Sequence, residues 1–253
     1  MPIQNSISNA IKGSIINGGG PAADFSTRSL SFDGIDDYVD CGNQSNLNFS
    51  ADDAFSFSVW FKKDTQTGFG GSLFRKQENS GVFSGYNMYV IDDKVNFRIR
   101  ESSSLFHQII DNNTHPLNTW VHYVVTYDGS RAAGGAGLNL YKNGTLLTNV
   151  TKSGNFSSGT GQTNEILGIG GDSSTGYLNG NIDEVAVWNS ELSATDVSTI
   201  YGTGTPSDLT SLSPISWWRC GDGDTSPTLT DNGSGGNNGT MTNFTNFSTD
   251  VPT

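Results

Sequence analysis

The sequence predicts an all-β protein built from many short antiparallel strands, and three observations support this. Apolar and polar residues alternate with the two-residue period of a strand in one short stretch after another. Glycine accounts for 32 of the 253 residues, and Asn, Ser and Thr are also frequent, so the chain is rich in residues that suit tight turns. Only 34% of the residues are hydrophobic while 11% are aromatic, so a core can form from a few large side chains. The abundance of Gly, Asn, Ser and Thr disfavours long helices.

Residues 1–27 differ in character from the rest of the chain. Ile3, Ile7 and Ile11 recur at helix-like spacing and precede the helix breaker Gly18–Pro21. This stretch is either a flexible leader or a short apolar arm that docks on a partner subunit. The isoleucines favour the arm, because a flexible leader has no use for them. We therefore expect residues 1–27 to contact other copies of the chain, or other subunits of a particle, in a homo-oligomer.

The main domain is expected over residues 28–201, where one alternating stretch follows another. Between residues 55 and 61, for example, every second side chain is Phe or Val. Ser193 is expected to cap a short helix that carries Val197 and Ile200 on one side. Regularly spaced strands of this kind indicate a sandwich or a barrel. The expected strands lie within residues 28–42, 54–63, 72–76, 86–100, 105–110, 120–130, 138–150, 165–171 and 177–189.

Five segments resemble, in the same order, segments of laminin-G-like, concanavalin A-like jelly rolls. They are FDGIDDYVDCG (32–42), FSFSVWFK (55–62), WVHYVVTYDG (120–129), LYKNG (140–144) and GNIDEVAVWNSELSATDV (180–197). Each segment alone is a weak signal, whereas five in this order are specific, and the resemblance covers residues 29–201. It implies a jelly-roll sandwich of two curved antiparallel sheets stacked about 10 Å apart.

The C-terminal segment, residues 202–253, resembles the opening strand region that usually precedes such a domain. Two arrangements follow from this. The segment folds back and supplies a missing edge strand in cis, or it pairs with a neighbouring chain. Trp217 and Trp218 indicate docking in either case, because adjacent tryptophans are costly to leave in water.

The best candidate for a metal site is acidic. Asp33, Asp36 and Asp37 lie in one turn, and the resemblance places this turn near the strand that carries Asp183. Hard oxygen ligands suit calcium, so we predict a structural calcium site formed by Asp33, Asp36 and Asp183. The alternative is that these carboxylates only close turns through hydrogen bonds to the backbone. A weaker acidic cluster is formed by Asp222, Asp224 and Asp231.

The two cysteines, Cys41 and Cys220, leave a disulfide open as one possibility. The alternative is a pair of free thiols, because the N-terminus lacks the basic start and apolar stretch of a signal peptide. No apolar run approaches the roughly 20 residues that span a bilayer, so no membrane insertion is expected. The formal net charge of −12 repels phosphate backbones and argues against a nucleic-acid partner.

Neither of two common catalytic patterns is evident, so we expect a protein that is not an enzyme. No strand carries the paired carboxylates of a glycoside hydrolase, and no Gly-x-Ser-x-Gly elbow is present. Trp60, Trp120 and Trp188 could be taken for platforms on which sugars stack. The resemblance places Trp60 and Trp120 in or against the core instead, and we do not favour Trp188 for this role either. Better candidates for ligand contact are exposed loop residues, namely Phe69, Phe83, Tyr86, Phe106 and His107.

Fold alone leaves function open, because this sandwich serves many roles. The composition, the arm and the tail, which resembles those of phage structural proteins, point first to a phage virion surface component that contacts host glycans. On this hypothesis the protein is a fibre or a capsid decoration. The alternative is a secreted or cell-surface bacterial carbohydrate-binding module, and a glycan-cleaving enzyme comes third.

Overall fold

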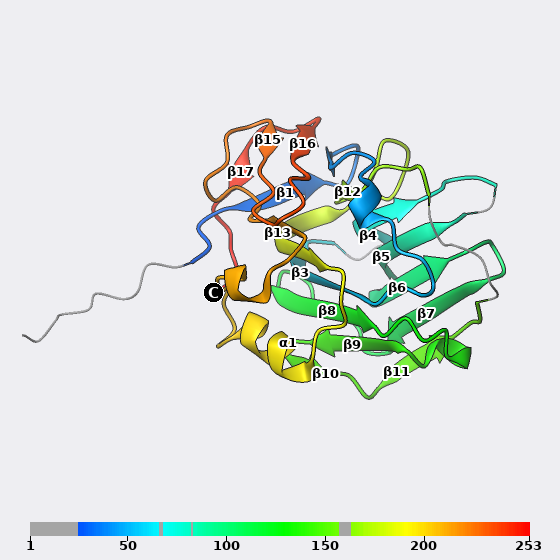
Figure 1. Ribbon diagram of the computed structural model, residues 1–253. Helices are drawn as coiled ribbons and strands as arrows, with labels where there is room; N and C mark the ends of the chain where they lie inside the picture. Colours follow the sequence, from blue (N-terminus) through cyan, green and yellow to red (C-terminus); the bar gives the residue numbers. More distant parts are fainter. Residues whose placement is uncertain (1–24, 66–67, 82, 157–162) are drawn as a thin grey trace, which may run out of the picture.

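The computed structural model describes residues 25–253 apart from 66–67, 82 and 157–162, and it confirms the two-sheet antiparallel sandwich (Figure 1). Within this part of the chain one sheet has eight strands and the other has nine. We call them sheet A and sheet B. The arm predicted over residues 1–27 lies almost wholly outside the described residues.

The strands of each sheet are given in spatial order. Sheet A consists of β10 (Thr145–Leu146), β9 (Leu138–Lys142), β8 (Val121–Tyr127), β3 (Phe55–Lys63), β13 (Asn179–Trp188), β1 (Ser29–Asp33) and β17 (Phe247–Ser248), with β14 (Ser216–Trp218) paired to the later part of β13. Sheet B consists of β11 (Val150–Ser153), β7 (Phe106–Asp111), β6 (Lys94–Arg100), β5 (Gly85–Ile91), β4 (Phe69–Gln77), β12 (Gly168–Ile169), β2 (Tyr38–Asp40), β16 (Gly239–Thr242) and β15 (Thr228–Leu229). The helical elements are α1 (Ala194–Tyr201) and the 3-10 turns Ser45–Leu47, Ala133–Gly135 and Thr210–Leu212.

The core lies between the two sheets and is dominated by aromatic rings, as the composition suggests. Phe57 of β3 stacks on Phe74 of β4 with ring centroids 4.6 Å apart. The ring centroid of Tyr86 of β5 lies 4.9 Å from that of Phe57. All three side chains are buried. A few large rings therefore supply the burial that the low hydrophobic content would otherwise limit.

The outer side of sheet A is covered by α1, which confirms the helix predicted after Ser193. The Ser193 and Asp196 side chains form a reciprocal capping box at its start. Val197 and Ile200 are buried in a second apolar cluster, together with Trp188 of β13. This second cluster covers the outer side of sheet A over parts of β8, β9 and β13.

The C-terminal segment completes both sheets of its own chain, so the cis arrangement is the correct one of the two alternatives. β14 pairs with β13, β16 with β2 and β17 with β1, and β17 lies beside β1 in Figure 1. Trp218 is fully buried, and its Nε1 donates to the carbonyl of Asn237 at 2.8 Å. Gly239 allows β16 to approach closely, because a Cβ there would lie 2.5 Å from Cγ1 of Val39.

Both cysteine thiols are free and buried in the core, so the structure has no Cys41–Cys220 disulfide. Burial raises the pKa of both thiols well above the ordinary value. The two cysteines act as small apolar core residues.

Candidate functional site

The acidic turn after β1 holds the first candidate site. One carboxylate oxygen from each of Asp33, Asp36 and Asp37 lies within 4.8 Å of the others. Asp33 Oδ1 accepts the N–H of Ile35 at 2.8 Å, and Asp37 Oδ2 accepts the N–H of Asp33 at 3.1 Å. Burial raises the pKa of Asp37, and the carboxylates of Asp33 and Asp36 raise it further, against the lowering effect of the backbone hydrogen bond. The donor set therefore fits a cation that prefers oxygen ligands.

Asp183 does not belong to this turn, which corrects the predicted ligand set. Asp33 pairs with Asn179 across β1 and β13, and Asp183 lies four residues further along β13. At about 3.3 Å per residue, this places the Asp183 backbone about 13 Å away. Asp37 takes its place in the cluster, and calcium binding itself stays a prediction.

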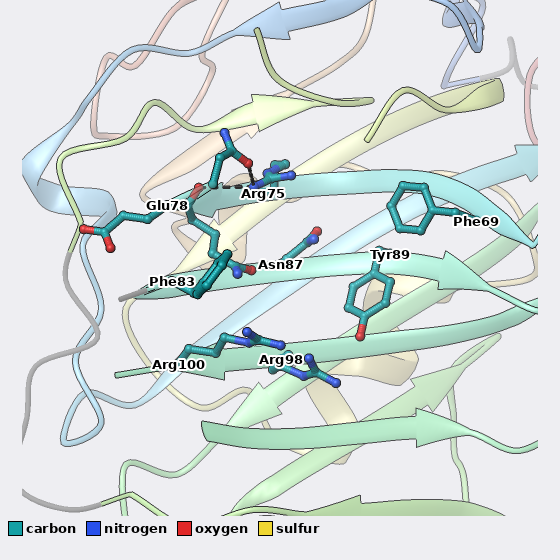
Figure 2. Close-up of a pocket in the computed structure, with 10 residues that line it drawn as sticks. Phe69, Arg75, Glu78, Phe83, Asn87, Tyr89, Arg98 and Arg100 are labelled. Atoms are coloured by element: carbon teal, nitrogen blue, oxygen red, sulfur yellow. Dashed lines mark hydrogen bonds between the residues drawn. The ribbon is translucent and has the colours of Figure 1, made fainter. Parts of the chain in front are cut away.

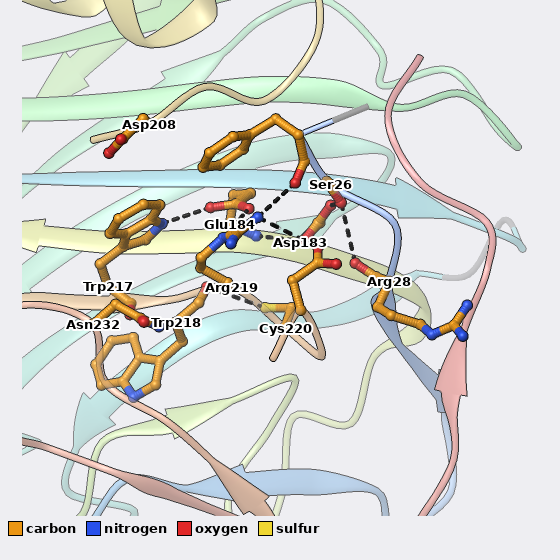
Figure 3. Close-up of polar contacts among 12 residues, drawn as sticks. Ser26, Arg28, Asp183, Glu184, Asp208, Trp217, Trp218, Arg219, Cys220 and Asn232 are labelled. Atoms are coloured by element: carbon orange, nitrogen blue, oxygen red, sulfur yellow. Dashed lines mark hydrogen bonds and ion pairs between the residues drawn. The ribbon is translucent and has the colours of Figure 1, made fainter. Parts of the chain in front are cut away.

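Asp183 forms instead a buried acidic pair with Glu184 on the outer side of sheet A (Figure 3). Glu184 has a left-handed φ of 48°, and the pairing of β13 with β3 shifts register between Asp183 and Ala186. In a regular strand two consecutive side chains point to opposite faces, whereas a bulge can turn them to the same side. The bulge thus brings both carboxyl groups to the segment that precedes β1 and to β14 with the residue that follows it.

The partners of this acidic pair come from the segment before β1, from β14 and from the residue that follows β14. Ser26 Oγ donates to Asp183 Oδ2 at 2.6 Å, and Trp217 Nε1 donates to Glu184 Oε2 at 2.5 Å. Arg219 Nε lies 3.4 Å from Glu184 Oε1. Burial raises the pKa of Asp183 well above its ordinary value, and the charge of Glu184 adds to the effect. Burial raises the pKa of Glu184 to about 7, against the lowering effects of Trp217 and Arg219.

The weaker acidic cluster consists of carboxylates that close loops. Asp224 Oδ1 accepts the N–H of Thr230 at 2.8 Å. Asp231 Oδ1 accepts the N–H of Trp217 at 2.7 Å, and its Oδ2 accepts the N–H of Asn237 at the same distance. Asp222 accepts the N–H of Thr27. These side chains hold the C-terminal segment in place and leave few oxygens for a ligand.

The outer side of sheet B contains the second candidate site, which we call the open face. Alternation along β5 and β6 sends one set of side chains inward and the other outward. A hollow of about 300 Å³ lies over β4, β5 and β6, and Figure 2 shows lining side chains on these three strands and on the loop between β4 and β5. The open face is made of Phe69, Arg75, Gln77, Asn87, Tyr89, Arg98, Arg100, Phe106 and Gln108, with Glu78, Asn79 and Phe83 at one end of the hollow.

Strand register arranges the open face in rows perpendicular to the strands. One row consists of Arg75, Asn87, Arg98 and Gln108. The next row consists of Gln77, Gly85, Arg100 and Phe106. At Gly85 φ is +111°, and a Cβ there would lie 2.1 Å from the carbonyl oxygen of Lys76. The second row therefore has a gap, which leaves the floor of the hollow open between Gln77 and Arg100.

Aromatic and cationic groups lie side by side on the open face. The guanidinium carbon of Arg98 lies 5.0 Å from the Phe106 ring centroid, and that of Arg100 lies 5.9 Å from it. The Tyr89 ring centroid is 6.2 Å from that of Phe69, which is 47% exposed. Burial raises the pKa of Tyr89, while the charge of Arg98 opposes this rise. The face thus offers ring surfaces and hydrogen-bond donors in one place.

The sequence identified part of this face and missed the rest. Of the five aromatic candidates for ligand contact, Phe69, Phe83 and Phe106 lie on or beside it. Tyr86 and His107 are buried instead, because their places in β5 and β7 point inward. The missed residues are Arg75, Gln77, Glu78, Asn79, Asn87, Tyr89, Arg98, Arg100 and Gln108. The alternation in YNMYVI and KVNFRIR assigns those of β5 and β6 to one side of their strands, and this was the available signal.

The three tryptophans considered and rejected as sugar platforms all form contacts within the protein. Trp60 stacks on His122 with centroids 4.8 Å apart, and Trp188 Nε1 donates to the Leu212 carbonyl at 3.0 Å. Trp120 is half-buried, and its Nε1 donates to Asp250 Oδ1 at 2.8 Å.

Another hollow, of about 360 Å³, lies near the 3-10 turn Ser45–Leu47. Amides and carboxylates dominate its lining, and its single ring, Phe49, is buried in the core. Asp53 Oδ2 accepts both the N–H and the hydroxyl of Ser50 at 2.7 Å. The carboxylate thus closes its own loop, and we regard the open face as the stronger candidate.

Comparison of the domain sequence with known protein families identifies its family. Residues 33–198 match the family model described as the concanavalin A-like lectin/glucanases superfamily. The chain belongs to this superfamily. None of the curated proteins compared has a significant match to it.

Several solved structures share the fold of this superfamily member. One is described as "a putative carbohydrate binding protein" from Bacteroides ovatus, with 16% identity, 90% of this chain and 61% of that chain covered, and a TM-score of 0.58. Another is the binding domain of Paraclostridial Mosquitocidal Protein 1, with 14% identity, 70% and 47% covered, and a TM-score of 0.51. A third is the heptameric SAP-like pentraxin of Limulus polyphemus, with 18% identity, 72% and 84% covered, and a TM-score of 0.50. The match thus spans less than two thirds of the first two structures, and at these identities the similarity is one of fold.

Among the described residues, no helix has the length and apolar character required to cross a lipid bilayer.

Proposed function

We propose that the chain is a non-catalytic binding module that contacts surface glycans through the open face of sheet B. The observation that carries the proposal is the unequal cover of the two sheets. Sheet A is overlaid by α1 and the second apolar cluster, whereas sheet B presents rings, amides and guanidinium groups around a hollow. Sugars combine apolar ring faces with many hydroxyls, and a site that recognises them needs ring surfaces beside fixed hydrogen-bonding groups.

The lining of the hollow supports binding over hydrolysis. Glycoside hydrolysis commonly requires two carboxyl groups about 5 to 10 Å apart on either side of the scissile bond. Of the described residues that line the hollow, Glu78 is the sole carboxylate. The similar structures named above include a binding domain and a protein described as carbohydrate-binding, which agrees with this proposal.

We propose further that the module is carried on a phage virion, as a fibre or a capsid decoration. This part rests on the sequence of residues 1–27 and on the resemblance of the tail, and the glycan site does not depend on either. A secreted bacterial module is the alternative carrier, and both carriers imply the same site. Copurification with phage particles and assembly through residues 1–27 would support the virion. A secreted monomer would contradict it and leave the glycan site unaffected.

A glycan array tests the proposed function directly. The variant Phe83→Ala Tyr89→Ala removes two rings from the hollow, and we expect it to weaken binding of any retained glycan about tenfold or more, because buried rings dominate binding energy. Leu146→Ala is the matched control, since Leu146 is an exposed apolar residue of sheet A. Equal binding by the double variant and the control, with both folded by thermal unfolding, would overturn the proposal.

A further inference from the structure

Only some of the described Lys and Arg side chains of this acidic protein form ion pairs with carboxylates. The chain has 13 Lys and Arg residues against 25 Asp and Glu residues. Within the described part, the basic residues paired with a carboxylate are Lys62, Lys63, Arg75, Arg131, Lys142 and Arg219. Arg98 and Arg100 form no ion pair with any described carboxylate, although acidic residues outnumber basic ones about two to one.

The neighbours of these two arginines leave hydrogen-bond donors unused. Arg98 Nη2 donates to Gln108 Oε1 at 2.8 Å, and both guanidinium groups lie against the Phe106 ring. The Nε atoms of Arg98 and Arg100 are buried and have no acceptor among the described residues. Because these Nε atoms are closed off from the hollow, a ligand there would be bound through the Nη groups of the two arginines.

Register places the two cations on one edge of the hollow. Arg98 and Arg100 are two residues apart on β6, so both project to the same side of sheet B. Arg75 lies two strands away in the row of Arg98, and Asp172 already neutralises it, with Oδ2 2.9 Å from its Nε. The positive charge available to a ligand is therefore concentrated at Arg98 and Arg100. Two like charges held together repel each other, and a bound anion relieves that repulsion.

We infer that the open face selects acidic saccharides, whose sugar rings carry carboxylate groups, over neutral ones. The inference rests on the proposed function, because it assigns a ligand class to the same face. The planar guanidinium fork matches a carboxylate with two parallel N–H donors, and Arg98 and Arg100 offer two such forks side by side. Tyr89 and Phe69 supply ring surface at the other end of the hollow for the apolar face of a neighbouring sugar. The row from Arg75 to Gln108 crosses three strand spacings, about 14 Å, which suits a short oligosaccharide better than a single sugar.

Matched pairs of glycans test the charge preference. The probes are sialyllactose against lactose and trigalacturonate against galactotriose, with affinity measured by isothermal titration on the full chain. We expect the acidic member of at least one pair to bind about tenfold or more tightly than its neutral partner. The variant Arg98→Gln Arg100→Gln should abolish this preference. Arg28→Gln is the control, because Arg28 is an exposed arginine next to β1 in the other sheet.

The outcomes separate the inference from the proposed function. If neutral and acidic members bind equally and the arginine variant matches Arg28→Gln, the charge preference is wrong. The proposed function still stands in that case if Tyr89→Ala weakens binding. A third outcome is that no member of either pair binds and that Tyr89→Ala abolishes no binding on a wider array of acidic and neutral glycans. In that case the charge preference and the proposed function are both overturned. If sulfated glycans on the same array bind as tightly as the carboxylated ones, the face prefers anions in general. That result would overturn the assignment to carboxylates.

Discussion

Asp36 lies in a turn where three carboxylates gather without a neighbouring cation in the described contacts. One oxygen each of Asp33 and Asp37 accepts a backbone N–H, so these two residues already stabilise the turn. Asp36 is exposed and contributes a third negative charge to the group. Because like charges within a few ångströms repel one another, a bound cation would stabilise the folded turn.

We expect millimolar calcium to raise the melting temperature of the protein relative to EDTA, through Asp33, Asp36 and Asp37. A ligand present at a hundred times its Kd stabilises the folded state by about 3 kcal/mol. Asp36→Asn should remove most of this rise, whereas Asp92→Asn, in an exposed turn, should retain it. Identical melting curves in calcium and in EDTA would show that the three carboxylates only close the turn.

At the scale of single elements, the buried carboxyl groups at the bulge in β13 make the free energy of unfolding depend on pH. Burial raises the pKa of Glu184 to about 7 from an ordinary value of 4.5. Below pH 4.5 the group is protonated in both the folded and the unfolded chain, and its contribution to stability is complete. As the pH rises from 4.5 to 7 the unfolded chain loses this proton first, so folding becomes less favourable. Asp183, whose pKa is raised well above its ordinary value, acts in the same direction.

Glu184→Gln is expected to remove the Glu184 share of this pH dependence. Gln keeps an oxygen acceptor for Trp217 Nε1 and has no charge to desolvate. Relative to wild type, the variant should gain up to about 3 kcal/mol in free energy of unfolding between pH 4 and pH 8. Denaturant titrations across this range measure the gain, with the exposed Glu191→Gln as control. A difference between variant and wild type that stays constant with pH would contradict the linkage.

The sequence predicted the strands of the sandwich, but it did not predict the bulge in β13 or the open face. Alternation predicted the strands of the sandwich, because the inward and outward sets follow from a two-residue period. The bulge at Glu184 lies beyond such reasoning, since it depends on how β13 meets β3, and it moves Asp183 into another site. The same limit applies to the open face. Alternation places Arg98 and Arg100 on one side of β6, but only long-range packing determines that no helix of the described chain covers that side.

On the scale of the whole molecule, the two outer faces are covered to different extents. The segment before β1, α1 and β14 gather on sheet A, where the second apolar cluster and the buried acidic pair hold them. Sheet B is thereby left uncovered over β4, β5 and β6 (Figure 2). A module attached through its N-terminal segment on the side of sheet A would therefore present its open face away from the attachment.

The C-terminal segment is an integral part of the sandwich, and its removal should unfold the domain. Core side chains that it supplies are Trp218, Cys220, Leu229 and Met241. Burying one large apolar side chain contributes about 1.5–3 kcal/mol, so their loss is comparable to the roughly 5–15 kcal/mol that stabilises a typical domain. Truncation also leaves β2 without its partner β16 and exposes a new sheet edge.

We therefore expect a chain that ends at Ser213 to lack a cooperative thermal transition and to aggregate. Addition of a peptide of residues 214–253 during refolding should restore the transition, because β14, β16 and β17 then pair in trans as they do in cis. A peptide in which Trp218 is replaced by Ala is the control, since this ring is fully buried. A truncated chain that melts cooperatively within a few degrees of the full chain would show that the sandwich is complete without the segment.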